Sequence, residues 1–224
     1  MAEGSAAMPQ QVLLVRHGET EWSRTGRHTG HTDVPLNAAG QLAASRLQPI
    51  LAAMSFELVL CSPLQRARET CERAGFGAAM RIEPDLMEWD YGDYEGLTSD
   101  QIHKDNPDWL VFDDGCPGGE SPENVGARAD NVIQLLGTVQ SSAAIFAHGH
   151  LLRVLAARWV GLPPSFGAHL LLDTAAVSLL SHYHGHPAIG IWNAPATALN
   201  AGLPKSPNSP MPEPAQSRRG SASG

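Results

Sequence analysis

Four residues able to take part in phosphoryl chemistry follow three apolar runs in this chain. Arg16 and His17 come after the first run, Arg66 after the second, and His148 directly after the third. A neutral imidazole can attack phosphorus and carry a phosphoryl group, and a guanidinium binds a phosphate dianion through two parallel hydrogen bonds. The pattern therefore predicts phosphoryl transfer, with His17 as the nucleophile.

Arg16 and Arg66 are the expected phosphate-binding residues. They would neutralise the phosphate, so that the nucleophile approaches a less negative phosphorus. Arg66 is expected one turn into a helix that begins at Ser62, whose free N–H groups could face the same anion. His148 could donate a hydrogen bond to the phosphoryl oxygens as charge shifts in the transition state. A lone histidine after a strand is more often a packing or capping residue, but two such histidines with arginines nearby favour catalysis.

The leaving group needs a proton, and the acidic segment 88–96 is the expected source. A carboxyl group serves as a general acid when burial or a nearby anion raises its pKa towards neutrality. Glu88 is preferred because it opens the irregular loop most able to fold over the strand ends. Asp90, Asp93 and Glu95 remain alternatives, and from composition alone an exposed loop acid is an equally good interpretation of Glu88.

A metal site is the alternative use of the histidines. His182, His184 and His186 share a two-residue spacing that could place imidazoles on one strand face as metal ligands. A polar hairpin turn is the preferred interpretation of this cluster. The three cysteines show no metal-ligand spacing and indicate a reducing compartment without a disulfide framework. No metal-ligand pattern therefore competes with a catalytic role for His17.

Composition limits the class of protein. The chain has 224 residues, of which 42% are apolar, and this is enough for a substantial core. Its formal net charge of −8 argues against non-specific binding to nucleic acid or anionic lipid. No apolar run approaches the ~20 residues that span a bilayer, and residues 1–10 lack the features of a secretion signal. We expect a cytoplasmic protein with no nucleic-acid or membrane partner, and no heptad pattern indicates an oligomeric state.

The elements that must position these residues alternate between strand and helix. Such alternation predicts an α/β protein with a mostly parallel sheet and helices on both faces, a three-layer α/β/α sandwich. Because parallel strands end at one edge of the sheet, the residues that follow them should lie together there. The expected strands are 11–15, 56–61, 81–83, 143–147, 175–182 and 188–192. The expected helices are 37–48 ended by Pro49, 62–74 capped by Ser62, 99–106, 121–138 and 151–160.

One folded domain is expected, over residues 11–193. Residues 1–10 are expected to form a flexible arm, and residues 194–224, rich in Pro, Ser, Ala and Gly, a disordered tail. Within the domain, the irregular segment 88–120 is expected to cover the active site as a lid or insert.

The motifs around these residues resemble those of the histidine phosphatase superfamily, in the branch that includes phosphoglycerate mutase. The segment 14–20, LVRHGET, matches the signature of that family and is highly specific. Residues 30–40 fit its pattern G-x-x-D-x-P-L-x-x-x-G, and residues 62–70 fit S-P-x-x-R-A-x-x-T. The segments GES and AHG follow in the family's order, so the resemblance covers residues 11–192.

The resemblance implies a role for each matched residue. His17 would be the residue that is phosphorylated, while Arg16, Arg66 and His148 would hold the phosphoryl group. Glu88 falls where the family keeps its proton donor, which later acts as the base that activates water. Further matched positions belong to the substrate-binding part of the site, and these are Thr29, Gly30, Tyr91 and Gly149. The resemblance also implies that no metal and no other cofactor is used.

Departures from the family pattern bear on the substrate. Many members have asparagine where this chain has Ser23, so a phosphate contact from Ser23 would be weaker or different. The mutases carry a lysine and paired arginines after the acid, whereas residues 92–112 here offer only Lys104 and no arginine. Hydrolysis by water is therefore favoured over isomerisation.

The acidic loop 88–96 looks most like that of phosphatases acting on sugar phosphates and sugar bisphosphates. The expected substrate is thus a small phosphorylated metabolite of this kind, hydrolysed through His17 with Glu88 as general acid and base. A phosphoglycerate mutase is the alternative enzyme. An inactive phosphoryl-binding regulatory module is the alternative outside enzymes, and it is disfavoured because the chain keeps candidates for both nucleophile and acid.

Overall fold

The computed structural model of this protein describes Pro9 and residues 11–199. Apart from Pro9, the expected N-terminal arm lies outside the described residues. The part of the expected tail beyond residue 199 lies outside them as well.

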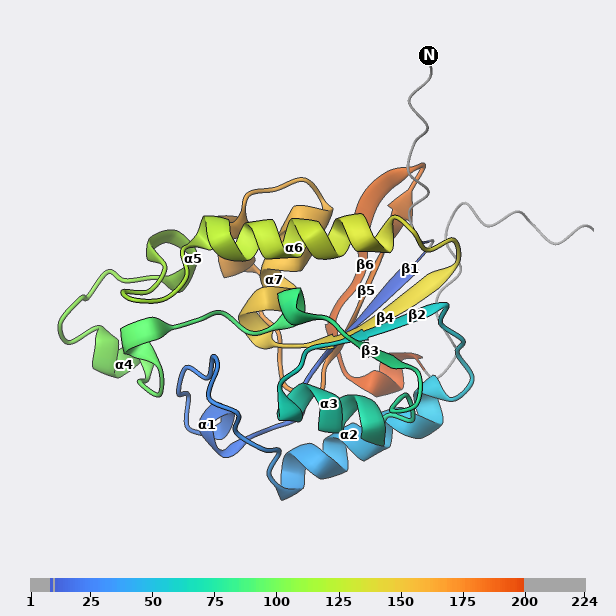
Figure 1. Cartoon of the computed structure of the whole chain (residues 1–224), viewed down its shortest axis with the longest axis horizontal. Coiled ribbons are helices and arrows are strands. Elements are labelled where there is room, and N and C mark those ends of the chain that lie inside the picture. The colour runs from blue at the N-terminus through green and yellow to red at the C-terminus, as the bar shows by residue number, and fades with distance from the viewer. Residues whose placement is uncertain (1–8, 10, 200–224) are drawn as a thin grey trace, which may run out of the picture.

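A six-stranded sheet with the order β3-β2-β4-β1-β5-β6 forms the centre of the molecule (Figure 1). The first four strands in this order are parallel to one another, β5 runs antiparallel to its neighbour β1, and β6 runs antiparallel to β5 at the edge of the sheet. The sheet is therefore mostly parallel, as the sequence predicts. The strands are β1 (Gln11–Arg16), β2 (Leu58–Cys61), β3 (Met80–Ile82), β4 (Ser142–Ala147), β5 (Val177–Tyr183) and β6 (His186–Ala194).

Long helices cover both faces of the sheet. The helices α2 (Ala38–Leu51) and α3 (Gln65–Arg73) lie on one face, and α6 (Pro122–Leu136) and α7 (Gly149–Trp159) lie on the other (Figure 1). This confirms the predicted three-layer α/β/α sandwich. The shorter helices are α1 (Glu21–Arg24), α4 (Ser99–Ile102), α5 (Val111–Asp114), and the 3₁₀ helices η1 (Pro84–Leu86), η2 (Gly92–Tyr94), η3 (Pro164–His169) and η4 (Ala196–Leu199).

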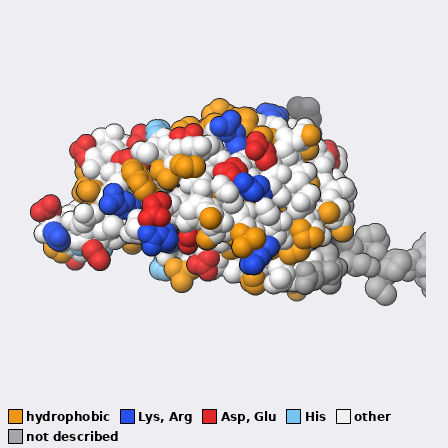
Figure 2. Space-filling model, turned by 90° about the horizontal axis from the view of Figure 1, so that it is seen from below, with side chains coloured by type: hydrophobic (Ala, Val, Ile, Leu, Met, Phe, Trp, Pro, Cys, Tyr) orange, Lys and Arg blue, Asp and Glu red, His pale blue; other side chains and the backbone are white. Residues whose placement is uncertain are grey.

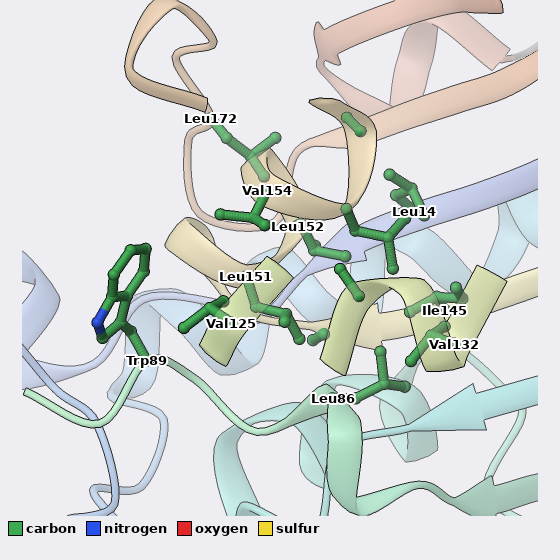
Figure 3. Packing of buried hydrophobic residues seen from close by; sticks show 14 of the residues in the cluster. Leu14, Leu86, Trp89, Val125, Val132, Ile145, Leu151, Leu152, Val154 and Leu172 are labelled. Atoms are coloured by element: carbon green, nitrogen blue, oxygen red, sulfur yellow. The ribbon is translucent and has the colours of Figure 1, made fainter. Parts of the chain in front are cut away.

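Two apolar layers explain why β1 is apolar from Val12 to Val15. Successive side chains of a strand point to opposite faces, so Leu14 packs with the layer under α6 and α7, while Leu13 packs with the layer over α2 and α3. Figure 3 shows Leu14 of β1 beside Leu152 of α7, and Ile145 of β4 beside Val132 of α6. Because both faces of β1 are buried, its first polar side chains emerge only where the strand ends.

Two helix boundaries differ from the sequence prediction. Asn37 caps α2 as expected, but α2 continues through Pro49 because the last turn buries Leu51 completely. The helix expected from Ser62 begins instead at Gln65, without a side-chain cap. The hydroxyl of Ser62 accepts a hydrogen bond from the Leu64 N–H before the helix starts.

The folded unit also extends past the boundary expected at residue 193. Strand β6 includes Ala194, and the 3₁₀ helix η4 follows it. Leu199 is buried and packs in the layer formed with α2 and α3. The expected start of the tail at residue 194 is therefore wrong, because one buried leucine anchors a stretch whose composition is typical of disorder.

Gly18 and Gly40 allow the start of α2 to pack directly on the backbone that follows β1. A Cβ at Gly18 would lie 2.5 Å from the carbonyl oxygen of Gly40, and a Cβ at Gly40 would lie 2.1 Å from that of Glu19. Both obstacles are backbone atoms, which cannot rotate away as a flexible side chain can. This contact therefore fixes the path of the chain immediately after His17.

The substitution Gly40→Ala should lower the free energy of unfolding by roughly 1–3 kcal/mol, the usual cost of overpacking a tight contact. Urea unfolding followed by circular dichroism measures this change. The control is Ala39→Leu, which adds a larger side chain on the exposed side of the same helix and should stay within about 0.5 kcal/mol of the parent. Equal stability of Gly40→Ala and the parent would contradict the contact.

Candidate active site

A cavity of about 170 Å³ opens at the edge of the sheet where β1 and β4 end. Seven residues selected from the sequence line it, namely Arg16, His17, Ser23, Thr29, Glu88, Tyr91 and Gly149. Gly30, Arg66 and His148 contact these residues but do not line the cavity. A larger cavity of about 800 Å³, between α2, residues 173–176 and η4, holds none of the selected residues.

His17 is only 5% exposed, and its hydrogen bonding defines the tautomer. Its Nδ1 lies 2.7 Å from the carbonyl oxygen of Gly18, which can only accept, so Nδ1 carries the hydrogen. Burial, and then the charges of Arg66 and Arg16, lower the pKa of His17 well below its ordinary value. The imidazole is therefore neutral near pH 7, and its Nε2 carries the lone pair that a nucleophile requires.

Arg16 is held beside this nucleophile with its buried Nε unpartnered among the described residues. Its Nη1 donates to the carbonyl oxygen of Leu172. Gly149 lies against the guanidinium, since a Cβ there would come within 3.2 Å of the Arg16 Cζ. A buried cationic donor without an acceptor is costly, so an anion is the expected partner in the working site.

Arg66 is fully buried and serves mainly as a bridge behind the cavity wall. Its Nε donates to Nδ1 of His148 over 3.1 Å. Its two terminal nitrogens donate to backbone carbonyls over 2.9 to 3.1 Å, and these belong to Thr29, Gly30 and Thr32. These bonds use four of its five N–H groups, so one Nη1 hydrogen has no acceptor among the described residues.

His148 is fully buried, and both of its ring nitrogens are engaged. Because Nδ1 accepts from Arg66, Nε2 carries the hydrogen and donates to the Ser62 hydroxyl over 2.7 Å. The ring centroids of His148 and His17 are 5.2 Å apart. A hydrogen bond from His148 to a phosphoryl oxygen therefore requires that its bond to Ser62 be exchanged.

Glu88 is 5% exposed and is fixed at the start of α7. One carboxylate oxygen accepts the N–H groups of Trp89 and Leu151, over 3.0 and 2.9 Å, and the other accepts that of His150, over 3.1 Å. The two donors from α7 belong to the first turn of the helix, whose free N–H groups attract anions. The carboxylate is thus immobilised in the same cavity as His17.

The other acids of the loop do not line the cavity. The carboxylate of Glu95 accepts the N–H groups of Gly30 and Thr32, over 2.9 and 3.1 Å, and so ties the loop to residues 29–32. Asp90 accepts from the N–H of Gly92 over 3.0 Å, and Asp93 is exposed. Glu88 is therefore the loop acid placed to exchange a proton with a ligand in this cavity.

Tyr91 and His150 form a neutral hydrogen-bonded pair in the wall. The Tyr91 hydroxyl lies 2.5 Å from Nδ1 of His150. Burial, followed by the charge of Glu88, raises the pKa of Tyr91, and burial lowers that of His150. Tyr91 is therefore the donor.

Ser23 contributes to the wall from α1, where its hydroxyl accepts the N–H of Thr20 in a capping box.

Several lining residues were not selected from the sequence, and these are Gly26, Arg27, His28, His150, Arg153 and Leu172. Arg153 donates to the carbonyls of Gly167 and Ala168, and its guanidinium lies 4.4 Å from the centre of the Phe112 ring. Burial lowers its pKa to about 10, at which it is still charged near neutrality. The spacing of Arg153 was the sequence signal that could have identified it. Arg153 follows Gly149 by four residues, and residues four apart share a helix face.

The family model of the histidine phosphatase superfamily (branch 1) matches residues 12–195 of the chain. The chain belongs to this superfamily. The sequence resemblance is thereby confirmed, and the protein is a phosphatase, a hydrolase of phosphate monoesters.

Named relatives of this histidine phosphatase act on phosphate esters. An acid phosphatase of Mycobacterium tuberculosis is 41% identical over 179 residues, which cover 78% of this chain and 88% of the relative. Sedoheptulose 1,7-bisphosphatase of Saccharomyces cerevisiae is 32% identical over 191 residues, which cover 70% of this chain and 69% of the relative. A mycobacterial glucosyl-3-phosphoglycerate phosphatase structure, 28% identical, has a TM-score of 0.74 over 83% of this chain and 99% of its own.

The histidine-rich hairpin of this phosphatase does not form a metal centre. Among the described residues, no group of three or more His, Cys, Asp or Glu side chains could hold a metal ion. His182 packs against Trp159, and His184 packs against Tyr183 in the β5–β6 turn. The polar hairpin interpretation is confirmed.

In the part of the chain that the structure describes, no helix is long and apolar enough to cross a membrane.

Three histidines at the active site should make the stability of this phosphatase depend on pH. Burial lowers the pKa of His17, His148 and His150 well below the ordinary value, whereas the unfolded chain titrates near pH 6.5. Below about pH 6.5 the unfolded state binds more protons, so the free energy of unfolding should fall by up to roughly 1.4 kcal/mol per pH unit for each histidine. Urea unfolding at a series of pH values from about 7.5 to about 5 measures the slope.

Two variants test whether this dependence of the unfolding free energy on pH comes from the active-site histidines. His150→Gln should remove one histidine's share of the slope, whereas His186→Gln in the exposed hairpin should leave the slope unchanged. A stability that does not change over this pH range would contradict the neutral state of the three rings.

Proposed function

We propose that this phosphatase hydrolyses sugar phosphates or sugar bisphosphates through a phosphohistidine formed on Nε2 of His17. One observation carries the proposal. A neutral histidine with Nε2 free of its hydrogen, and a buried carboxylate, line the same cavity beside an arginine donor that lacks a partner. These are the nucleophile, the proton carrier and the anion-binding group that phosphoryl transfer requires.

In the first step, Nε2 of His17 attacks phosphorus, and the bond from phosphorus to the leaving oxygen breaks. Glu88, in its protonated form, gives its proton to that oxygen, so that an alcohol leaves rather than an alkoxide. Arg16 neutralises charge on the phosphoryl oxygens through its free Nε–H, and Arg66 does so through its remaining Nη1 hydrogen. The products are the dephosphorylated sugar and phospho-His17.

In the second step, water attacks the phosphorus of phospho-His17. Glu88, now a carboxylate, accepts a proton from the water, and the bond between phosphorus and Nε2 breaks. Inorganic phosphate leaves, and His17 and Glu88 return to their starting states. All bonds made and broken involve only the substrate, water and these two side chains, so the cycle needs neither a metal nor another cofactor.

The substrate class rests on the relatives and on the outer part of the cavity. Sedoheptulose 1,7-bisphosphatase of yeast is named for a sugar bisphosphate. Arg27 and Arg153 line the cavity in addition to Arg16, so a second anionic group on the substrate has cations to meet. Lys104 is exposed and does not line the cavity, which supports hydrolysis over a mutase reaction that grips a carboxylate.

The surface supports a small metabolite as partner rather than nucleic acid. Figure 2 shows the face that carries α2 and α3, where basic and acidic side chains of the described residues are interspersed rather than gathered by sign. Nucleic-acid binding depends on a continuous basic surface. The three free, buried cysteines, Cys61, Cys71 and Cys116, support a reducing, cytoplasmic location.

Loss of the nucleophile should separate activity from folding. His17→Ala should lower kcat/KM for a sugar phosphate by at least about 10⁴-fold while the circular dichroism spectrum stays that of the parent. Glu88→Gln should lower kcat by roughly 10²–10⁴-fold, and less for p-nitrophenyl phosphate, because its leaving group needs little protonation. Activity should survive EDTA. A metal requirement, or turnover by His17→Ala, would contradict the mechanism.

A second-anion role for Arg153 should appear as a change in substrate preference. Arg153→Met should lower kcat/KM for a sugar bisphosphate about tenfold more than for the corresponding monophosphate, because it removes one charged contact worth roughly 1–2 kcal/mol. Arg158→Met, further along α7 and paired with Asp130, is the matched control and should leave the ratio unchanged. An equal effect on both substrates would contradict a second-anion role and would mean that Arg153 only stabilises η3.

A further inference from the structure

Residues 172–176 contact Arg16 and His17 at the end of β1. No sequence motif indicates this contact. The Leu172 carbonyl accepts the Nη1–H of Arg16. The Ala176 carbonyl accepts the backbone N–H of Arg16 over 3.2 Å, and the Ala175 N–H donates to the carbonyl of His17 over 3.0 Å. The backbone of Arg16, the backbone of His17 and the guanidinium of Arg16 are therefore all hydrogen-bonded to this one segment.

Asp173 and Asn193 tie that segment to the edge of the sheet through reciprocal hydrogen bonds. The Asp173 N–H donates to Oδ1 of Asn193 over 2.8 Å, and Nδ2 of Asn193 donates to the Asp173 carboxylate over 3.1 Å. The backbone N–H of Asn193 donates in turn to the buried hydroxyl of Ser178 on β5 over 3.0 Å. The segment is thus anchored to both strands of the hairpin.

Two residues at this anchor adopt a left-handed backbone that side chains disfavour. Ala175 has a φ of 56° and Asn193 a φ of 50°, and neither is glycine. Such conformations persist only where surrounding contacts determine them, and they gather at functional sites. Here the surrounding contacts are the Asp173–Asn193 pair and the bond from Ala175 to His17.

Arg16 is the residue that depends most on this anchor. Its Nη1 is bound to Leu172, the residue immediately before Asp173, and its Nε is left buried and unpartnered. A shift of the Leu172 carbonyl would rotate the planar guanidinium and so redirect Nε away from the phosphoryl position. Asp173 is itself exposed and adds little to the core. Its contribution is to orient the Leu172 carbonyl and the Arg16 guanidinium.

We propose that Asp173 and Asn193 are positioning residues for phosphoryl transfer, which hold the Leu172 carbonyl and through it aim the Arg16 guanidinium at the phosphate. This inference rests on the proposed roles of Arg16 and His17. It adds two residues, from a loop and an edge strand, that touch neither substrate nor nucleophile. Their removal should weaken every phosphate ligand equally, whatever its leaving group.

The test compares variants that remove the pair with one that keeps its geometry. Asn193→Gly deletes the side-chain bonds while glycine accepts the left-handed φ, and Asp173→Ala removes the carboxylate. Asp173→Asn keeps an acceptor oxygen for Asn193 and removes only the charge. The readouts are the Kd of inorganic phosphate by calorimetry, kcat/KM for p-nitrophenyl phosphate and for a sugar phosphate, and Tm.

Asn193→Gly and Asp173→Ala should weaken phosphate binding and lower kcat/KM about tenfold for both esters, with Asp173→Asn within about threefold of the parent. In an Arg16→Lys background, Asn193→Gly should change kcat/KM less than about twofold, because the pair acts through Arg16. If Asn193→Gly does not fold, the comparison of Asp173→Ala with Asp173→Asn decides in its place.

An unchanged phosphate Kd in folded Asp173→Ala, or a full tenfold loss in the Arg16→Lys background, would overturn the inference. Failure of the proposed function looks different. In that case the parent enzyme shows no turnover that depends on His17, while phosphate binding still reports whether the pair positions Arg16.

Discussion

The constraint on which this structure depends is the burial of a neutral histidine between two guanidinium groups. A cationic imidazole at position 17 would be repelled by Arg16 and Arg66 and would lack water to solvate it, so burial and charge together keep it neutral. The same two cations must persist without a bound anion. Backbone carbonyls stabilise the two cations. That of Leu172 accepts a hydrogen bond from Arg16, and those of Thr29, Gly30 and Thr32 accept hydrogen bonds from Arg66. The buried Nε of Arg16 remains without a partner among the described residues, and the proposed mechanism assigns it to the phosphate.

The order of strands and helices brings His17, His148 and Glu88 together at one edge of the sheet. Parallel strands β1 and β4 are neighbours in the sheet, so His17 and His148 leave it side by side. The helix that follows β4 starts at this edge, and its first N–H groups fix the carboxylate of Glu88. An irregular loop thus acquires a fixed acid by binding to a helix terminus rather than by its own secondary structure.

The sequence predicted well those features that depend on local pattern. The apolar runs located the strands, and the residues after them lie at a common edge, as the alternation of strand and helix requires. The sequence separated Glu88 from Asp90 and Glu95 mainly by family resemblance, because the difference lies in long-range contacts to α7 and to residues 29–32. Arg153 and the Asp173–Asn193 pair carry no motif, since their positions follow from packing. The Ser62 cap and the stop at Pro49 failed where a tertiary contact outweighed a local preference.

The most direct measurement is to identify the phosphorylated residue during turnover. The enzyme is mixed rapidly with a sugar phosphate, quenched in alkali, where phosphohistidine is stable, and mapped by mass spectrometry of its peptides. The account predicts a phosphoryl group on the peptide that contains His17, formed within the first turnover and lost in acid. A phosphoryl group on a serine or a carboxylate, or product release with no labelled peptide at any time, would contradict it.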